Sequence, residues 1–104
     1  MVSTLLSKYV GLVAWSINGF ALDLHFDTDI ETTSPERQLQ LHITAIDEEQ
    51  TQIKVAGRTR DVPLDLGVYR RNPQGQWEVQ PESACLMEER ATGLIAARID
   101  NWLE

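Results

Sequence analysis

The sequence predicts one α+β domain: an antiparallel β-meander of five to six strands with a C-terminal amphipathic helix packed on one face. The sheet is expected to be strongly curved or to form a partly open barrel. Three observations lead to this fold class: Asn18-Gly19 lies between two alternating segments, residues 38–46 alternate apolar and polar side chains, and apolar residues recur at helical spacing near the C-terminus. Strands followed by a helix favour α+β over alternating α/β.

The first expected element is a β-hairpin centred on Asn18-Gly19, two residues that tolerate the positive φ angles of a tight turn. Folding the chain there sets Ile17 opposite Phe20 and gathers apolar side chains on one face. A helix over residues 3–17 is the competing interpretation, because apolar residues there also follow helical spacing and Asn-Gly would end a helix. The paired faces and the β-branched content favour the hairpin, and the helix stays open as an alternative.

The middle of the chain predicts a surface loop at 27–37, then strands at 38–46 and 51–56. A one-residue slip would turn every side chain to the other face, so we expect the register that sets Val55 opposite Ile43. Residues 57–64 are expected to be irregular, because Pro63 is incompatible with a central strand.

A second hairpin is expected around Asn72-Pro73-Gln74-Gly75, whose residues match a type I turn. It sets Arg70 opposite Trp77, where the guanidinium would stack on the indole. Together the strand registers leave three apolar residues on the face away from the helix: Leu12, Ile46 and Tyr69. Apolar residues on an exposed face indicate a second layer or a subunit contact.

The last expected element is a helix from about Ser83, its N-cap, through Leu103. Gly93 is expected to permit a close crossing over the sheet. The apolar stripe of this helix consists of Ala84, Met87, Ala91, Leu94, Ile95, Ile99 and Trp102.

Composition sets the broad class of the protein. The 104 residues and 42% hydrophobic content fit a single domain over 1–104. The single cysteine, Cys85, excludes an internal disulfide, and no basic leader or apolar run of about 20 residues is present. We therefore expect a cytoplasmic protein with no membrane association. The formal charge of −7 opposes binding to nucleic acid.

The basic residues are concentrated in the centre of this acidic chain, where residues 52–80 carry more basic than acidic side chains. Four arginines there, Arg58, Arg60, Arg70 and Arg71, are the candidate binding residues for a partner or an anionic ligand. Trp102, near the end of the expected helix, is a candidate interface aromatic.

Asp23, His25 and His42 are weak candidates for a divalent metal site, since carboxylates and imidazoles are common ligands. No phosphate-binding glycine loop and no nucleophile motif frames a catalytic residue. We expect no cofactor, no catalytic residue and no enzymatic activity.

These observations predict a non-catalytic, acidic interaction or adaptor protein that contacts a protein partner or forms a homodimer. The first alternative is a small-molecule or anion-binding module in which the arginines face an acidic ligand. A metal-assisted enzyme that uses His25, Asp23 and His42 is the least favoured alternative.

Overall fold

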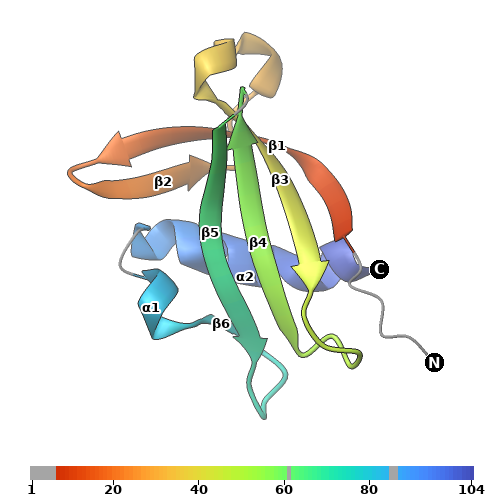
Figure 1. Ribbon diagram of the computed structural model, residues 1–104. Helices are drawn as coiled ribbons and strands as arrows, with labels where there is room; N and C mark the ends of the chain where they lie inside the picture. Colours follow the sequence, from red (N-terminus) through yellow and green to blue (C-terminus); the bar gives the residue numbers. More distant parts are fainter. Residues whose placement is uncertain (1–6, 61, 85–86) are drawn as a thin grey trace.

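Six antiparallel strands form one curled sheet in the order β2-β1-β3-β4-β5-β6, and a long helix packs against its concave side (Figure 1). The structure is a computed structural model that describes residues 7–60, 62–84 and 87–104. Its elements are β1 (Ser7–Asn18), β2 (Ala21–His25), η1 (Ile30–Thr32), η2 (Pro35–Arg37), β3 (Gln38–Ala45), β4 (Gln52–Thr59), β5 (Val62–Arg71), β6 (Trp77–Val79), α1 (Pro81–Ala84) and α2 (Glu89–Leu103).

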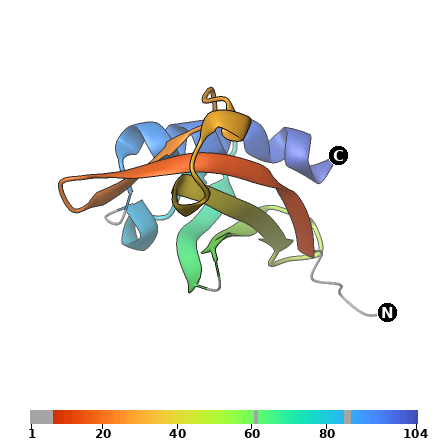
Figure 2. The ribbon, with the colours of Figure 1, turned by 90° about the horizontal axis from the view of Figure 1, so that it is seen from above.

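The predicted α+β class is confirmed, with the sheet curving around one side of α2 as a half-barrel (Figure 2). The strand order departs from a simple meander at one connection, because β3 pairs with β1 and not with β2. The expected loop at 27–37 carries η1 and η2 and leads the chain from β2 to the other side of β1. This arrangement is accessible because β1 is long enough to pair with β3 near its start and with β2 near its end.

A bulge near the start of β1 breaks the regular pairing with β3 between Tyr9 and Gly11. Gly11 has φ 137°, a backbone conformation that glycine adopts without the penalty of a Cβ. Bulges bend a strand and increase its twist. The second half of β1 accordingly leaves the main sheet, and the β1–β2 hairpin projects from it (Figure 1).

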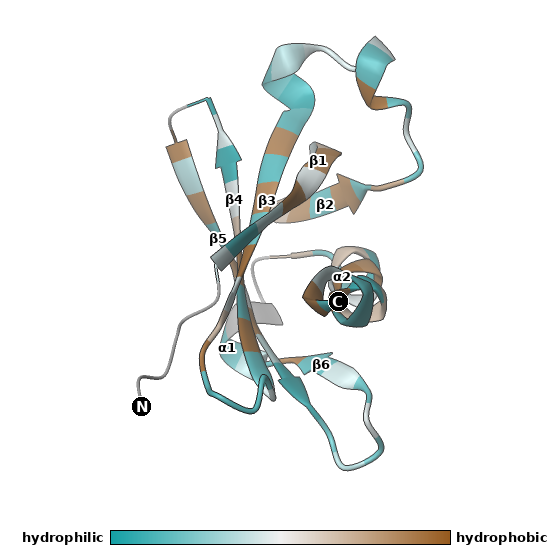
Figure 3. Cartoon of the chain, turned by 90° about the vertical axis from the view of Figure 1, so that its right-hand side faces the viewer, coloured by the Kyte–Doolittle hydropathy of each residue, from teal (hydrophilic) through white to brown (hydrophobic). Residues whose placement is uncertain are grey.

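The hydrophobic core lies between the concave face of the sheet and α2. On α2 the predicted stripe is confirmed at Ala91, Ile95 and Ile99, which are all fully buried. Figure 3, seen along α2, shows its hydrophobic residues on the side toward the strands. The strands contribute Val13, Leu24, Leu39, Leu41, Ile43, Ile53, Val55, Leu66 and Tyr69.

The predicted register of β3 and β4 is confirmed, because Ile43 pairs with Val55 and Ala45 pairs with Ile53. All four side chains are buried on the concave face. Burial of one face therefore selected this register over its one-residue alternative.

The first hairpin forms as expected, and the helix over residues 3–17 is wrong for residues 7–17. The register of the hairpin differs by two residues from the predicted one, since Ile17 pairs with Leu22 and Asn18 with Ala21. The turn residues are therefore Gly19 and Phe20, and Gly19 has φ 66°, as the first position of a type II′ turn requires. A two-residue shift preserves the apolar face, but it moves Phe20 to the tip, where it is fully exposed.

The predicted register of the second hairpin is wrong by one residue, since Arg71 pairs with Trp77 and Tyr69 with Val79. Gly75, at φ 84°, adds a left-handed residue after the turn, which is typical of a turn closed by a bulge. This slip turns Tyr69 to the concave face, where it is completely buried, instead of the face away from the helix.

The irregular segment expected at 57–64 is also wrong, because β4 extends to Thr59 and β5 begins at Val62 and includes Pro63. In the described chain, this first part of β5 pairs with β4 alone, and β6 joins only from Tyr69 onward. Pro63 therefore lies on a sheet edge, where a residue without an N–H is tolerated.

The single helix expected from Ser83 is interrupted, because α1 ends at Ala84 and α2 begins at Glu89. Met87 forms a parallel bridge with Leu22 of β2, and the N–H of Glu88 donates to the carbonyl of Leu22 at 2.8 Å. Ser83 lies inside α1, so the N-cap of α2 is Glu88, with ψ 145°.

Gly93 does not mediate a close crossing over the sheet, because it is exposed and a Cβ added there would meet nothing within 4 Å. Cys85 lies outside the described residues. None of the described helices combines the length and the apolar character that crossing a membrane requires.

Candidate binding groove

An open groove of about 490 Å³ lies where the half-barrel fails to close, between the β1–β2 hairpin and β5. The hairpin contributes Trp15, Ile17, Phe20 and Leu22 to its lining. Thr59 and residues 63–66 of β5 line the opposite wall, and Met87, which bridges to Leu22 of β2, also contributes to the lining. We call this site the hairpin groove. Its volume lies within the range typical of ligand sites in proteins.

Backbone pairing explains why the groove stays open. Along residues 62–66, β5 has a sheet partner on one side only within the described chain. The outer edge of β2 is occupied, since the carbonyl of Leu22 accepts from Glu88 and the carbonyl of Leu24 accepts from Nη1 of Arg90 at 2.8 Å. The two edges are therefore separated by side chains and do not form a continuous ladder.

The lining is mainly apolar and carries hydrophobic residues from both the hairpin and β5. Among the described lining residues Asp65 is the only charged one, and its Oδ1 accepts a hydrogen bond from the N–H of Gly67 at 2.9 Å. Arg37 lies over the ring of Trp15 at 5.6 Å from its centroid. Apolar walls with few polar groups are suited to binding apolar side chains or ligands.

Large hydrophobic residues are unusually exposed around this groove. Phe20 is 104% exposed, Ile17 is 55% exposed, and Val62, next to Pro63, is 56% exposed. Single exposed hydrophobic residues are common on protein surfaces. Ile17 and Phe20 both line one apolar concavity, which makes the hairpin groove the candidate functional site.

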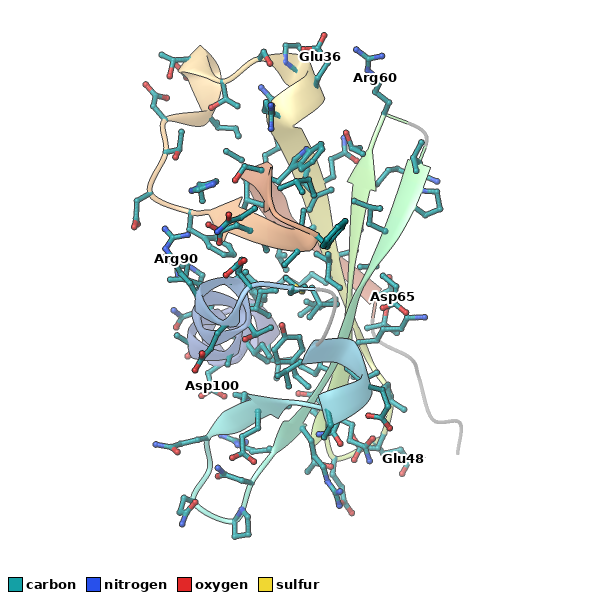
Figure 4. All side chains as sticks on the ribbon, turned by 90° about the vertical axis from the view of Figure 1, so that its left-hand side faces the viewer. Glu36, Glu48, Arg60, Asp65, Arg90 and Asp100 are labelled. Atoms are coloured by element: carbon teal, nitrogen blue, oxygen red, sulfur yellow. The ribbon has the colours of Figure 1, made fainter. Side chains whose placement is uncertain are left out.

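The four predicted arginines do not form one patch. Arg58 pairs with Pro63 at one end of the β4–β5 hairpin, whereas Arg70 pairs with Gln52 at the other end. Six residues of β4 separate these positions, which is about 20 Å at the rise of an extended strand. Figure 4 places Arg60 beside Glu36 at the first of these ends.

Two of these arginines are already engaged within the chain. Arg60 pairs with Glu36 at 3.2 Å, and Arg71 pairs with Asp100 at 3.4 Å while its guanidinium lies 5.6 Å from the ring centroid of Trp77. The stack expected for Arg70 is therefore made by Arg71, as the one-residue change of register requires. This arrangement does not support a single anion-binding site formed by the four arginines.

Arg70 borders a shallow surface depression with Glu78 and Glu89, two carboxylates that oppose an anionic ligand. Arg58 is exposed on β4 and remains a solvated cation.

Trp102 closes one end of the core. It is half-buried, and its ring centroid lies 6.3 Å from that of Phe26. Nζ of Lys8, at the start of β1, donates to the carbonyls of Trp102 and Glu104 at 3.0 Å. These contacts assign Trp102 to holding the end of α2 against the sheet.

The two histidines lie too far apart to share a metal ion. His25 pairs with Ala14 from one side of β1, and His42 pairs with Tyr9 from the other side. Ala14 also pairs with Gln38, so the two histidines lie four residues apart along β3, about 13 Å, and two strand spacings apart, about 10 Å, whereas metal ligands lie about 2 Å from the ion. The described residues contain no group of three or more His, Cys, Asp or Glu side chains placed to hold a metal.

Ser16, His25 and Asp23 are adjacent on the β1–β2 hairpin, but their geometry is not that of a catalytic triad. Ser16 Oγ lies 2.8 Å from Nε2 of His25, and Asp23 Oδ2 lies 3.8 Å from the same nitrogen. In a triad the carboxylate binds Nδ1 and leaves Nε2 to the serine. Asp23 is instead paired with Arg90 of α2 at 3.1 Å.

None of the residues that line the hairpin groove was predicted from the sequence as a binding residue. Glycine at position 19 followed by Phe20 was the available signal, because a type II′ turn places glycine first and would leave the aromatic at the tip. The other wall carried no such signal, since Pro63 and Leu64 read as a loop when β5 is not recognised.

Together, the fold and the groove define a class: an α+β half-barrel domain with an open apolar groove. Comparison with protein families, curated proteins and solved structures finds no match to this chain.

Proposed function

We propose that this protein is a non-catalytic interaction protein that binds a partner through the hairpin groove. The observation that carries the proposal is the exposure of Phe20 and Ile17 beside a groove whose walls are apolar on both sides. Leaving apolar surface in water forgoes about 25 cal/mol for each Å². A partner that covers these side chains recovers that free energy.

The groove is held open by the backbone, which supports its use as a preformed site. Five residue pairs hold the projecting end of the hairpin, from Ala14 with His25 to Asn18 with Ala21. On the other side, the first part of β5 is paired with β4. Preformed sites bind with a smaller entropic cost than sites that must first be ordered.

The chemistry of the lining supports binding and not catalysis. Among its described residues there is no histidine, cysteine, lysine or arginine, and the one carboxylate, Asp65, is exposed to solvent. General acid–base and nucleophilic catalysis need such groups in convergent positions.

Solvent mapping by NMR tests whether the groove is a binding surface whatever its partner. With 2-propanol and phenol as probes, we expect the largest amide shifts at Ile17, Phe20, Leu64 and Met87, because small organic molecules collect where apolar walls converge. Phe20→Ser is expected to reduce these shifts while changing stability by no more than about 0.5 kcal/mol, since the side chain is fully exposed. Shifts concentrated on the opposite face of the sheet would contradict the proposal.

A second candidate is a homodimer formed through the convex face of the sheet. Tyr9 and Leu12 are 52% and 39% exposed there, and Ile46, which follows the last residue of β3, is 41% exposed. The Tyr9 ring contacts that of His42 at 5.3 Å between centroids and forms part of this surface.

Light scattering behind a sizing column tests the homodimer. This candidate predicts a solution mass twice that of one chain, reduced to one chain by Leu12→Ser and unchanged by Phe20→Ser. A dimer that persists in Leu12→Ser and dissociates in Phe20→Ser would assign self-association to the groove. A monomer at every concentration would remove this candidate.

A further inference from the structure

We infer that the partner segment is a basic amphipathic helix, which inserts apolar side chains into the hairpin groove and does not add a strand to the sheet. This inference rests on the proposed function and names the class of partner. Three features of the groove lead to it: the backbone groups along its edges, the apolar walls and the charge at its rim.

The β5 edge is poorly equipped to pair with another strand. Strand addition needs free backbone N–H groups along the edge. Pro63 has no N–H, and the N–H of Gly67 is already bonded to Asp65 Oδ1. A proline and a side-chain cap of this kind protect sheet edges from pairing with other chains.

The β2 edge across the groove is occupied as well. The carbonyl of Leu22 accepts from Glu88, and the carbonyl of Leu24 accepts from Arg90. An extended peptide in the groove would therefore leave many of its own N–H and C=O groups against apolar walls without partners. Each unpaired buried group costs about 1–3 kcal/mol.

A helix avoids this cost because its backbone groups hydrogen-bond within the helix. Only its side chains need to match the groove, and residues at spacings of three and four lie on one face. Such a face meets Trp15, Leu22 and Leu64 on the groove walls and contacts Phe20 and Ile17 at the exposed rim. Helix-in-groove recognition uses this arrangement.

Charge favours a basic helix over an acidic one. Asp65 is exposed at the groove and has no ion pair within the part of the chain that the structure describes. Arg60, beyond the end of β4, is paired with Glu36, and Arg37 belongs to a loop that also carries Asp27, Asp29, Glu31 and Glu36. The formal charge of −7 would also steer a cationic segment toward the protein.

Three synthetic peptides of about 14 residues, long enough for a marginal helix, test the inference. The first places leucines at helical spacing on a lysine background, the second replaces lysine with glutamate, and the third alternates leucine and lysine as a strand does. Affinity is measured by fluorescence anisotropy of the labelled peptides against the wild-type protein. We expect the helical lysine peptide to bind at least about tenfold more tightly than either of the others.

Variants separate groove binding from general attraction to an acidic protein. Phe20→Ser keeps the net charge, so a loss of about tenfold or more in affinity assigns binding to the groove. Asp65→Asn is expected to weaken the lysine peptide several-fold at low salt, with the difference disappearing at high salt. Ile46→Ser removes an exposed apolar side chain outside the groove and is expected to leave the affinity unchanged.

The outcomes distinguish this inference from the proposed function. If the strand-patterned or the glutamate peptide binds as tightly as the helical lysine peptide and Phe20→Ser still weakens it, the groove is a binding site and the basic-helix inference is overturned. The inference also fails if no peptide binds although organic probes collect in the groove. If affinity is indifferent to Phe20→Ser and the probes avoid the groove, the proposed function fails as well.

Discussion

Gly57→Ala is expected to lower the free energy of unfolding by about 1–3 kcal/mol, the cost of forcing an extra methyl group into a packed core. Gly57 lies on the buried face of β4, and a Cβ built there would be 2.8 Å from Cδ2 and 2.9 Å from Cγ of Leu39. Leu39 is completely buried, so it cannot move aside without displacing its own neighbours.

Gly93→Ala is the matched control, because it is the same substitution with the opposite expected sign. Gly93 is exposed inside α2, and an added Cβ would meet nothing within 4 Å. Replacing an interior helix glycine with alanine stabilises by about 1 kcal/mol. Urea denaturation of both variants measures the two changes. Equal effects at the two positions would show that the packing of Leu39 against Gly57 is not as described.

Tyr69→Phe is expected to raise stability by about 1 kcal/mol near neutral pH. The Tyr69 side chain is fully buried in the core, and its hydroxyl has no hydrogen-bond partner among the described residues. An unpaired buried hydroxyl costs about 1–3 kcal/mol in desolvation, so removing the hydroxyl raises the free energy of unfolding. Tyr9→Phe, at a half-exposed position, is the control and is expected to change stability little.

Burial of Tyr69 is also expected to make the protein less stable at alkaline pH. Burial raises the pKa of Tyr69 well above its ordinary value of 10.0. Above about pH 10 the unfolded chain releases this proton while the folded chain keeps it, so the unfolded state binds fewer protons. Stability should then fall by up to about 1.4 kcal/mol per pH unit from this group.

Urea denaturation between about pH 9 and 11 compares the wild type with Tyr69→Phe, so that contributions from other titrating groups cancel. The expected result is a steeper loss of stability in the wild type. Identical slopes would mean that the Tyr69 hydroxyl reaches solvent in the folded protein or lies beside groups that stabilise its phenolate.

Local patterns were sufficient to predict the class of the fold and several of its elements. The alternation along residues 38–46 identified β3 and, because one face had to be buried, also its register with β4. Helical spacing identified the buried stripe of Ala91, Ile95 and Ile99. These features depend on the periodicity of a single segment, which is present in the sequence itself.

Hairpin registers were harder to predict, because moving or lengthening the turn by a single residue changes the pairing of both strands. Placing the turn at Gly19-Phe20, one position later than Asn18-Gly19, moved Phe20 from a strand to the tip. The extra left-handed residue at Gly75 carried Tyr69 from the outer face into the core. Two turns that are each compatible with a sequence differ by little locally, so the burial of distant residues selects between them.

By itself, then, the sequence determined an acidic α+β domain with alternating strands and a C-terminal amphipathic helix. Only the tertiary structure decided where the candidate site lies, because the hairpin groove joins Phe20 and Ile17 of one hairpin to Pro63 and Leu64 of another. The tertiary structure also determined that the four arginines lie apart and that Met87, expected within the C-terminal helix, instead pairs with Leu22 of β2. The physical reason is that periodicity records which face of a segment is buried, whereas the segments that meet are set by packing between residues distant in the chain.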